Sequence, residues 1–274
     1  MTWRLIVHPK MEGRWNMAVD EALAEAVGAA GDGASGAAAN GASGAAAHAG
    51  VVRLYGFSPA TLSLGRFQKT RGQFLLPRLE ADGVTLVRRP TGGHAVLHDD
   101  ELTYSVALPK GGTQLSRKRE VYLFIAEILL AGLANLGIDG TINAAQRGDV
   151  HNPDCFGSAG EYEISGRAGR KLIGSAQMTT RVAILQHGSI PMSNPGQGVA
   201  RYLEAGQPLE SHPPSSVNEE AGRPLSFEEV QSAFSRAFQE RLQAQISDVT
   251  PAEEARARKI LQEKYATDAW NLAC

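Results

Sequence analysis

Cys155 is the residue of this sequence best suited to nucleophilic chemistry, because it lies in the polar segment NPDCFGS at residues 152–158. A single cysteine is more often a small buried hydrophobe than a nucleophile, yet a loop with proline and glycine favours exposure and function. Attack by a thiol requires a cation or base that lowers its pKa from about 8.5. Lys171 is a candidate for that cation, although from spacing alone an exposed lysine at a strand end is the better interpretation.

The segment RRPTGGH at residues 88–94 could bind an anionic ligand. Its two arginines can pair with phosphate or carboxylate, and its glycines allow the backbone to approach a ligand closely. Glycine pairs between strands are more often plain hairpin turns. The loop alone therefore favours the turn interpretation.

Two histidines lie at the ends of strand-like segments. His187 follows the apolar run VAILQ and could be a base, a hydrogen-bond donor or a core residue, and His98 is equally ambiguous at the end of the glycine-containing hairpin. No His/Cys cluster has metal-ligand spacing, and the sequence has neither a Gly-x-Ser-x-Gly elbow nor a Walker-type loop. These residues by themselves leave the reaction open.

The elements that must position these residues follow from periodicity and turn signals. Alternation predicts a first strand over residues 3–7, and Asn16 is expected to cap an alanine-rich helix over 16–27. Strand-like runs follow at residues 51–57, 61–67, 84–90, 94–98 and 102–109, with a short helix at 74–81. Ser116 is expected to open a long helix that ends at Gly137.

A second β-rich block and two capped helices complete the chain. Residues 162–165, 170–178 and 182–190 are expected to form a meander of antiparallel strands. Ser226–Glu229 and Thr250–Glu253 have the pattern of capping boxes, the second with a proline at the first helical position. Strands in runs with flanking helices predict an α+β domain with a mixed or antiparallel sheet.

Composition excludes several classes of protein. The chain has 274 residues with 27 Lys+Arg and 29 Asp+Glu, and this net charge of −2 argues against electrostatic binding to nucleic acid or an anionic membrane. Two cysteines, Cys155 and Cys274, make neither a disulfide framework nor a zinc site. The N-terminus lacks a signal peptide's apolar core, and the apolar stretch 121–138 contains Glu127 and Asn135. We therefore expect a cytoplasmic protein without a membrane span.

Residues 28–50 differ in composition from the rest of the chain. Eighteen of these 23 residues are Gly or Ala, so the segment has nothing bulky to bury. We expect a flexible surface insertion within a single catalytic domain that spans residues 1–274.

Three ordered motifs carry a resemblance to a known family. RRPTGGHAVLHDDELTYSV (88–106), CFGSAGEYEISGRAGRKLIGSAQ (155–177) and LQHGSI (185–190) resemble the lipoate–protein ligase/octanoyltransferase superfamily, which has the biotin/lipoate protein ligase catalytic domain. The resemblance is greatest to its cysteine-dependent, ligase-like octanoyltransferase branch. NMAVDEAL (16–23) and KYATDAWN (264–271) extend it over almost the whole chain outside residues 28–50.

The resemblance implies transfer of an octanoyl group from acyl carrier protein to a lysine of a lipoyl-accepting protein, such as glycine cleavage H protein or a dehydrogenase E2 lipoyl domain. It implies that Cys155 forms an acyl thioester and that Lys171 lowers the pKa of the Cys155 thiol. The substrate-binding residues that it implies are Arg88, Arg89, Gly92, Gly93, His94, His98, Ser175 and His187. It implies no metal and no cofactor.

Three alternatives stay open. An ATP-dependent lipoate or octanoate ligase would use ATP and Mg²⁺, with Lys171 at the acyl-adenylate phosphate and Cys155 incidental. A relay enzyme would move octanoate from one lipoyl domain to another, and a non-catalytic relative would only bind acyl groups or carriers. The transferase is favoured because Gly92-Gly93-His94 stands where ATP-using ligases typically have three glycines, and because few residues follow KYATDAWN to form their accessory domain.

Overall fold

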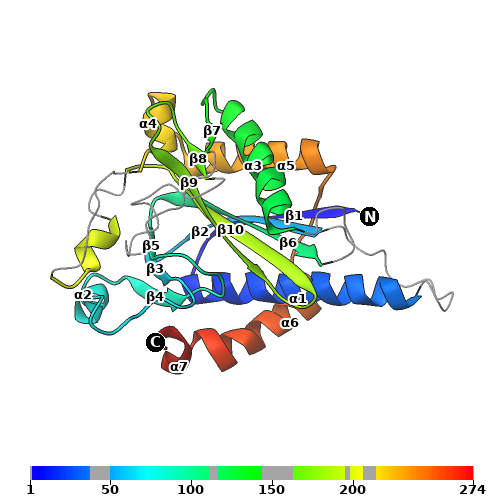
Figure 1. The fold of residues 1–274 in the computed structure, drawn as a ribbon, viewed down its shortest axis with the longest axis horizontal. Helices are drawn as coiled ribbons and strands as arrows, with labels where there is room; N and C mark the ends of the chain where they lie inside the picture. Colours follow the sequence, from blue (N-terminus) through cyan, green and yellow to red (C-terminus); the bar gives the residue numbers. More distant parts are fainter. Residues whose placement is uncertain are drawn as a thin grey trace.

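The computed structural model describes residues 2–37, 50–110, 117–143, 163–194, 198–205 and 214–273, without the side chains of 32–37. Within these ranges the chain forms an eight-stranded sheet, a three-stranded sheet and the helices that cover them (Figure 1). Cys155, Cys274 and Ser116 lie outside the described residues. The α+β class predicted from the sequence is confirmed.

The larger sheet is mixed. Its strand order is β11-β1-β2-β6-β10-β9-β8-β7, in which β11, β1 and β2 run parallel and the pairs from β2 to β7 run antiparallel. The strands are β1 Trp3–Met11, β2 Gly50–Phe57, β6 Glu101–Pro109, β7 Thr141–Ile142, β8 Ile164–Ser165, β9 Lys171–Thr179, β10 Ala183–Pro191 and β11 Gln245–Ile246. The predicted meander is present as β8, β9 and β10, and it places His187 opposite Ser105 of β6 and Ala176 of β9.

Three short strands form the second sheet, in the order β4-β3-β5. β3 (Thr61–Leu64) pairs parallel with β4 (Thr85–Arg88) and antiparallel with β5 (Val96–His98). The RRPTGGH segment begins at the end of β4 and leads to β5. The loop is therefore anchored at both ends by strands of the smaller sheet, β4 and β5.

Helices cover both faces of the larger sheet (Figure 1). α1 (Gly13–Ala37) and α6 (Pro251–Ile260) lie on one face, and α3 (Lys118–Ala134) and α5 (Phe227–Leu242) lie on the other. The shorter elements are α2 (Leu76–Ala81), a 3-10 helix (Gly198–Tyr202), α4 (Val217–Ala221), a π-helical turn (Leu261–Tyr265) and α7 (Asp268–Asn271). None of the helices within the described ranges is both long and apolar enough to cross a membrane.

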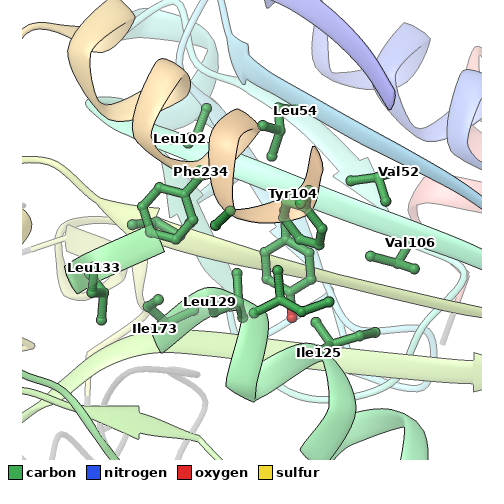
Figure 2. Close-up of a cluster of buried hydrophobic side chains, with 14 of the residues drawn as sticks. Val52, Leu54, Leu102, Tyr104, Val106, Ile125, Leu129, Leu133, Ile173 and Phe234 are labelled. Carbon is green, nitrogen blue, oxygen red and sulfur yellow. The ribbon is translucent and has the colours of Figure 1, made fainter. Parts of the chain in front are cut away.

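The core beneath α3 and α5 consists of large aliphatic and aromatic side chains (Figure 2). Leu54 of β2, Tyr104 of β6, Leu129 of α3 and Phe234 of α5 are buried there. Gly132 permits the close approach of α3 to α5, because a Cβ at this position would lie 2.4 Å from the Phe234 ring. Each such buried side chain stabilises the fold by about 1.5–3 kcal/mol.

A second core lies between the larger sheet and α1. Met17 and Leu23 of α1 pack there with Tyr55 of β2 and Leu185 of β10. Because side chains alternate along a strand, Leu54 and Tyr55 belong to opposite cores. β2 is therefore buried on both faces, and the pocket described below forms at its C-terminal end.

Local signals identify most of the helix boundaries. Ser226 and Thr250 accept hydrogen bonds from the backbone N–H groups of Glu229 and Glu253, and both capping boxes are complete. Gly137 has a φ of 74°, which a residue after a helix end adopts readily only as glycine. These three predictions are confirmed.

α1 begins earlier than predicted. The helix starts at Gly13, and Asn16 is a buried residue within it instead of its N-cap. The Asn16 amide donates hydrogen bonds to the carbonyl oxygens of Met11 (3.2 Å) and Gly56 (3.0 Å). The prediction was wrong because these tertiary bonds join α1 to β1 and β2, and local sequence does not show them.

α1 also continues past Val27, to Ala37, so residues 28–37 of the expected insertion are helical. Alanine is the best helix former. Gly28 and Gly31 allow close packing of this part of the helix. A Cβ on Gly28 would lie 2.5 Å from the Val182 side chain, and a Cβ on Gly31 would lie 2.7 Å from the Pro109 side chain. Residues 38–49 lie outside the described residues, and Gly50 is the first residue of β2.

Candidate active site

A pocket lies between the two sheets and the start of α1. Met17, Tyr55, Phe57 and Val96 supply apolar wall. The remaining lining residues are small or polar: Ser63, Arg89, His98, Thr103, Gly174, Ser175, Ala176, His187, Gly188 and Ser189. This lining suits a ligand with an extended apolar part and one polar end.

Arg89 determines the shape of the loop beside the pocket. Its Nε donates to Thr91 Oγ1 (3.2 Å), and one terminal nitrogen donates to the carbonyl oxygens of Gly92 and His94, both at 2.7 Å. The other terminal nitrogen donates to the Ser63 carbonyl oxygen (3.1 Å) and hydroxyl (3.3 Å). A guanidinium group has five N–H donors. Arg89 therefore ties the RRPTGGH loop to β3.

Glycines allow that loop to lie directly against β3. A Cβ on Gly65, the residue after β3, would lie 1.8 Å from the Gly93 carbonyl oxygen. Gly93 itself has a φ of 88°, in the left-handed region. Close approach between two parts of the chain is the observed use of these glycines.

His187 connects the loop to a buried carboxylate. Its Nε2 lies 2.6 Å from Thr91 Oγ1, and its Nδ1 lies 3.7 Å from Asp20 Oδ2. Burial lowers the pKa of His187, although the nearby Asp20 acts in the opposite direction. His187 is therefore neutral at pH 7, with one ring nitrogen as donor and the other as acceptor.

Asp20 is the centre of a buried polar cluster on α1. It accepts hydrogen bonds from Arg53 (2.9 Å), Tyr55 (2.7 Å) and Ser105 (2.8 Å). Burial alone would raise the pKa of Asp20, but the contact with His187 and the charge of Arg53 outweigh it and lower that pKa. Asp20 is therefore ionised at neutral pH.

His98 makes a second, similar set of contacts. Its Nε2 lies 2.8 Å from Ser63 Oγ, and its Nδ1 lies 2.8 Å from Glu101 Oε1. The Phe57 ring stacks on the imidazole, with 4.1 Å between ring centroids. The Ser189 hydroxyl also donates to Glu101. These contacts hold both ring nitrogens and one face of the His98 imidazole.

Lys171 is buried and paired with a carboxylate. Its Nζ lies 2.6 Å from Glu163 Oε1, and the two side chains are 3% and 8% exposed. The interpretation of Lys171 as an exposed lysine at a strand end is therefore wrong. A buried ammonium requires such a partner to stay charged. Glu163 directly follows residues 144–162, which lie outside the described ranges and include Cys155.

Arg88 contacts other parts of the chain and does not line the pocket. It donates to the carbonyl oxygens of Gly65 and Gln68, each at 2.8 Å, and to Thr70 Oγ1 at 2.6 Å. The C-terminal segment KYATDAWN also reaches it. Trp270 Nε1 donates to the Arg88 carbonyl oxygen (2.7 Å), and the Arg88 N–H donates to Asn271 Oδ1 (3.0 Å).

The pocket brings together four of the predicted substrate-binding residues, Arg89, His98, Ser175 and His187. Arg88, Gly92, Gly93 and His94 are not among its lining residues. The Ser175 hydroxyl is hydrogen-bonded to that of Tyr104 (2.6 Å), and burial raises the pKa of Tyr104 to about 12. Within the described ranges, no three His, Cys, Asp or Glu side chains gather in a way that could hold a metal ion.

We did not predict a role for Asp20, Glu101, Ser63 or Glu163 from the sequence. Asp20 lies within the recognised NMAVDEAL motif, and a carboxylate among apolar helix residues is a signal that could have identified it. Glu101 begins a strand that is otherwise largely apolar. For Ser63 and Glu163, no comparable local signal exists.

Comparison with known proteins identifies close counterparts over the whole chain. The family model described as the lipoyl protein ligase A/B catalytic domain matches residues 12–239. Octanoyltransferase LipM of Carboxydothermus hydrogenoformans is 36% identical over 286 residues, and that of Halalkalibacterium halodurans is 33% identical over 291 residues. Each alignment covers 98% of both chains. A crystal structure of lipoate-protein ligase A bound with ATP superposes with a TM-score of 0.78 at 23% identity, over 99% of both chains.

Proposed function

The chain belongs to the lipoyl protein ligase A/B catalytic domain family, and we propose that it is an octanoyltransferase that acts in protein lipoylation. The observation that carries this function is the identity of 36% and 33% to two octanoyltransferases over 98% of the chain. The structural similarity to lipoate-protein ligase A supports the fold and not the choice of acyl donor.

The proposed reaction has two acyl transfers. The Cys155 thiolate attacks the thioester carbonyl of octanoyl-acyl carrier protein, a C–S bond to Cys155 forms, the C–S bond to the carrier breaks, and the carrier leaves as a thiolate. The neutral ε-amine of a lysine on a lipoyl-accepting protein then attacks the enzyme thioester. An amide forms, the Cys155 sulfur leaves, and the amine's proton is released. A thiolate is the required nucleophile in the first step.

Lys171 supplies the positive charge in this proposal. A cation within about 4–6 Å of a thiol favours the thiolate and lowers its pKa by about 1–3 units. The buried pairing with Glu163 fixes the ammonium at the start of β9, and Glu163 directly follows the segment that contains Cys155.

The pocket is the proposed site of the octanoyl chain. Its apolar wall of Met17, Tyr55, Phe57 and Val96 offers burial to the methylene groups. Each buried methylene contributes about 0.8 kcal/mol to binding. The polar side, with Arg89, His98 and His187, faces the end of the chain that carries the carbonyl. No cofactor takes part in this scheme.

A panel of acyl donors tests the proposed function. The protein is incubated with an apo lipoyl domain and one of three donors: octanoyl-acyl carrier protein, octanoate with ATP and Mg²⁺, or an octanoylated lipoyl domain. Acylation of the acceptor, measured by intact-protein mass, is expected with octanoyl-acyl carrier protein. Transfer only from octanoate and ATP, with pyrophosphate release, would identify a ligase, and transfer only from the octanoylated domain would identify a relay enzyme.

A further inference from the structure

Two chains of polar contacts run from buried carboxylates to Arg89. Each has the order carboxylate, histidine, hydroxyl and guanidinium. The first consists of Asp20, His187 and Thr91, and the second of Glu101, His98 and Ser63. Both histidines line the pocket. The two chains therefore meet at the cation that holds the RRPTGGH loop.

The donors of the first chain are ordered by the charged groups at its two ends. Arg89 has no acceptor atom, so its Nε–H donates to Thr91 Oγ1, which keeps a second lone pair. The ionised Asp20 beside His187 Nδ1 favours a hydrogen on that nitrogen, so that Nε2 accepts from the Thr91 hydroxyl at 2.6 Å. A neutral imidazole that accepts at Nε2 carries its hydrogen on Nδ1. That hydrogen faces Asp20 Oδ2, 3.7 Å from Nδ1, where a carboxylate favours this tautomer.

The second chain has the same direction. A terminal nitrogen of Arg89 donates to Ser63 Oγ. The Glu101 carboxylate can only accept, so His98 donates its Nδ1 hydrogen to Glu101 Oε1 at 2.8 Å, and its Nε2 accepts from the Ser63 hydroxyl at 2.8 Å. Both carboxylates thus select the Nδ1–H tautomer, and each imidazole presents an acceptor toward the hydroxyl that Arg89 contacts.

The contacts of Arg89 also join these two chains to the RRPTGGH loop. The same guanidinium holds the carbonyl oxygens of Gly92 and His94. Rotation of either hydroxyl, or exchange of either tautomer, would put two hydrogens or two lone pairs face to face in a buried site. Such an unmatched pair costs about 1–3 kcal/mol. The loop and Arg89 are therefore stable in one orientation when both carboxylates are in place.

We propose that Asp20 and Glu101 are positioning residues for acyl transfer, which act through His187 with Thr91 and through His98 with Ser63 on the orientation of Arg89. This inference rests on the proposed function for the reaction that is affected. It assigns to Arg89, which itself lines the pocket, the role of holding the RRPTGGH loop. Neither carboxylate touches the substrate in this arrangement.

A merely structural role would make the same residues matter for stability alone. A positioning role lowers the acylation rate per folded molecule, and it makes the effects of substitutions within one chain of contacts depend on each other. Misplacement of reacting groups by about 1 Å can reduce a rate by about 100-fold. A structural hydrogen bond instead changes the folded fraction, and the rate per folded molecule stays the same.

The Thr91 hydroxyl offers the cleanest test of the first chain. Thr91→Val removes the hydroxyl with little change in shape, Thr91→Ser retains it, and Thr61→Val removes a buried hydroxyl that donates to the Pro59 carbonyl oxygen instead. Single-turnover acylation by octanoyl-acyl carrier protein is expected to fall roughly 10- to 100-fold in Thr91→Val. Thr91→Ser restores most of the rate, and Thr61→Val has an unfolding midpoint similar to that of Thr91→Val with a normal rate per folded molecule.

A double-mutant cycle tests the second chain. Glu101→Gln and Ser63→Ala each interrupt the path to Arg89, so the double variant should lose no more of kcat/KM than the more impaired single variant. Effects that multiply would show that the two residues act independently. That result, or a Thr91→Val rate equal to that of Thr61→Val, would overturn the inference.

Two measurements stay informative if octanoyl-acyl carrier protein proves not to be a donor, in which case the proposed function fails. The ¹⁵N–¹H correlation spectrum of the wild-type imidazoles should show His98 and His187 protonated at Nδ1, and an Nε2–H tautomer at either residue contradicts the inference. Hydrogen exchange of a peptide that covers residues 88–96 should be faster in Thr91→Val than in Thr61→Val. Equal exchange in these two variants also contradicts it.

Discussion

Replacement of Asp20 by asparagine should destabilise the fold strongly, because Asp20 balances the charge of a buried arginine. The Arg53 and Asp20 side chains are 0% and 1% exposed, and their charged groups lie 2.9 Å apart. Asp20→Asn keeps the size of the side chain but leaves the Arg53 guanidinium without its carboxylate. Removing one partner of a buried ion pair costs about 3–5 kcal/mol, which is a large part of a typical total stability of about 5–15 kcal/mol.

Urea unfolding at pH 7 measures this effect, with an exposed pair as the matched control. Glu25 and Arg256 form a bidentate pair in which both side chains are 43% exposed. Glu25→Gln should therefore change the free energy of unfolding by about 1 kcal/mol or less. A loss below about 1 kcal/mol in Asp20→Asn, with an unchanged m-value, would refute the reasoning about Arg53.

The same pair predicts a pH dependence with a definite sign. The pKa of Asp20 is lowered in the folded state, so Asp20 binds its proton more readily when the chain is unfolded. Its contribution to stability is therefore fully present above the unfolded pKa of about 3.9 and is lost as the pH falls through the folded value. Asp20→Asn should lack this part of the acid dependence, and an unchanged acid profile would contradict the assignment.

Three further predictions concern the lysine, the pocket and the C-terminal segment. Lys171→Met should raise the pKa of the Cys155 thiol, so that its alkylation by iodoacetamide shifts to higher pH by about one unit or more; an unchanged pH profile would exclude Lys171 as the cation. Ala176→Leu fills part of the pocket, so the apparent KM should rise more for octanoyl than for hexanoyl donors, and equal changes would place the acyl chain elsewhere. Trp270→Phe keeps an aromatic ring for the contacts with Arg66 and Lys264 but removes the donor to the Arg88 carbonyl oxygen. Urea unfolding should show a loss of about 1 kcal/mol, and no loss would mean that this bond does not stabilise the loop.

Features with local causes could be predicted from the sequence. The capping boxes at Ser226 and Thr250 and the helix stop at Gly137 depend on residues within one turn, and each is present as predicted. The meander of β8, β9 and β10 also follows from alternation and short turns. The parallel pairing of β1 with β2 joins segments separated by the whole of α1, and periodicity does not contain that information.

The candidate site shows the same division. Residue type and motif identified Arg89, His98, Ser175 and His187, which the pocket brings together. The residues around Arg88 in the sequence could not show that its side chain donates to the carbonyl oxygens of Gly65, Gln68 and Trp270, because these residues lie far from it in the chain. Asp20 was missed for a similar reason, because its partners come from β2, β6 and β10.

In the proposed mechanism, Cys155 carries the octanoyl group between donor and acceptor. Peptide mapping tests this after the enzyme has been mixed with octanoyl-acyl carrier protein in the absence of acceptor. We predict an octanoyl adduct on the peptide that contains Cys155, removable by hydroxylamine and by addition of an apo lipoyl domain, and absent in Cys155→Ala. An unmodified Cys155 peptide, or full transfer activity in Cys155→Ala, would contradict this mechanism.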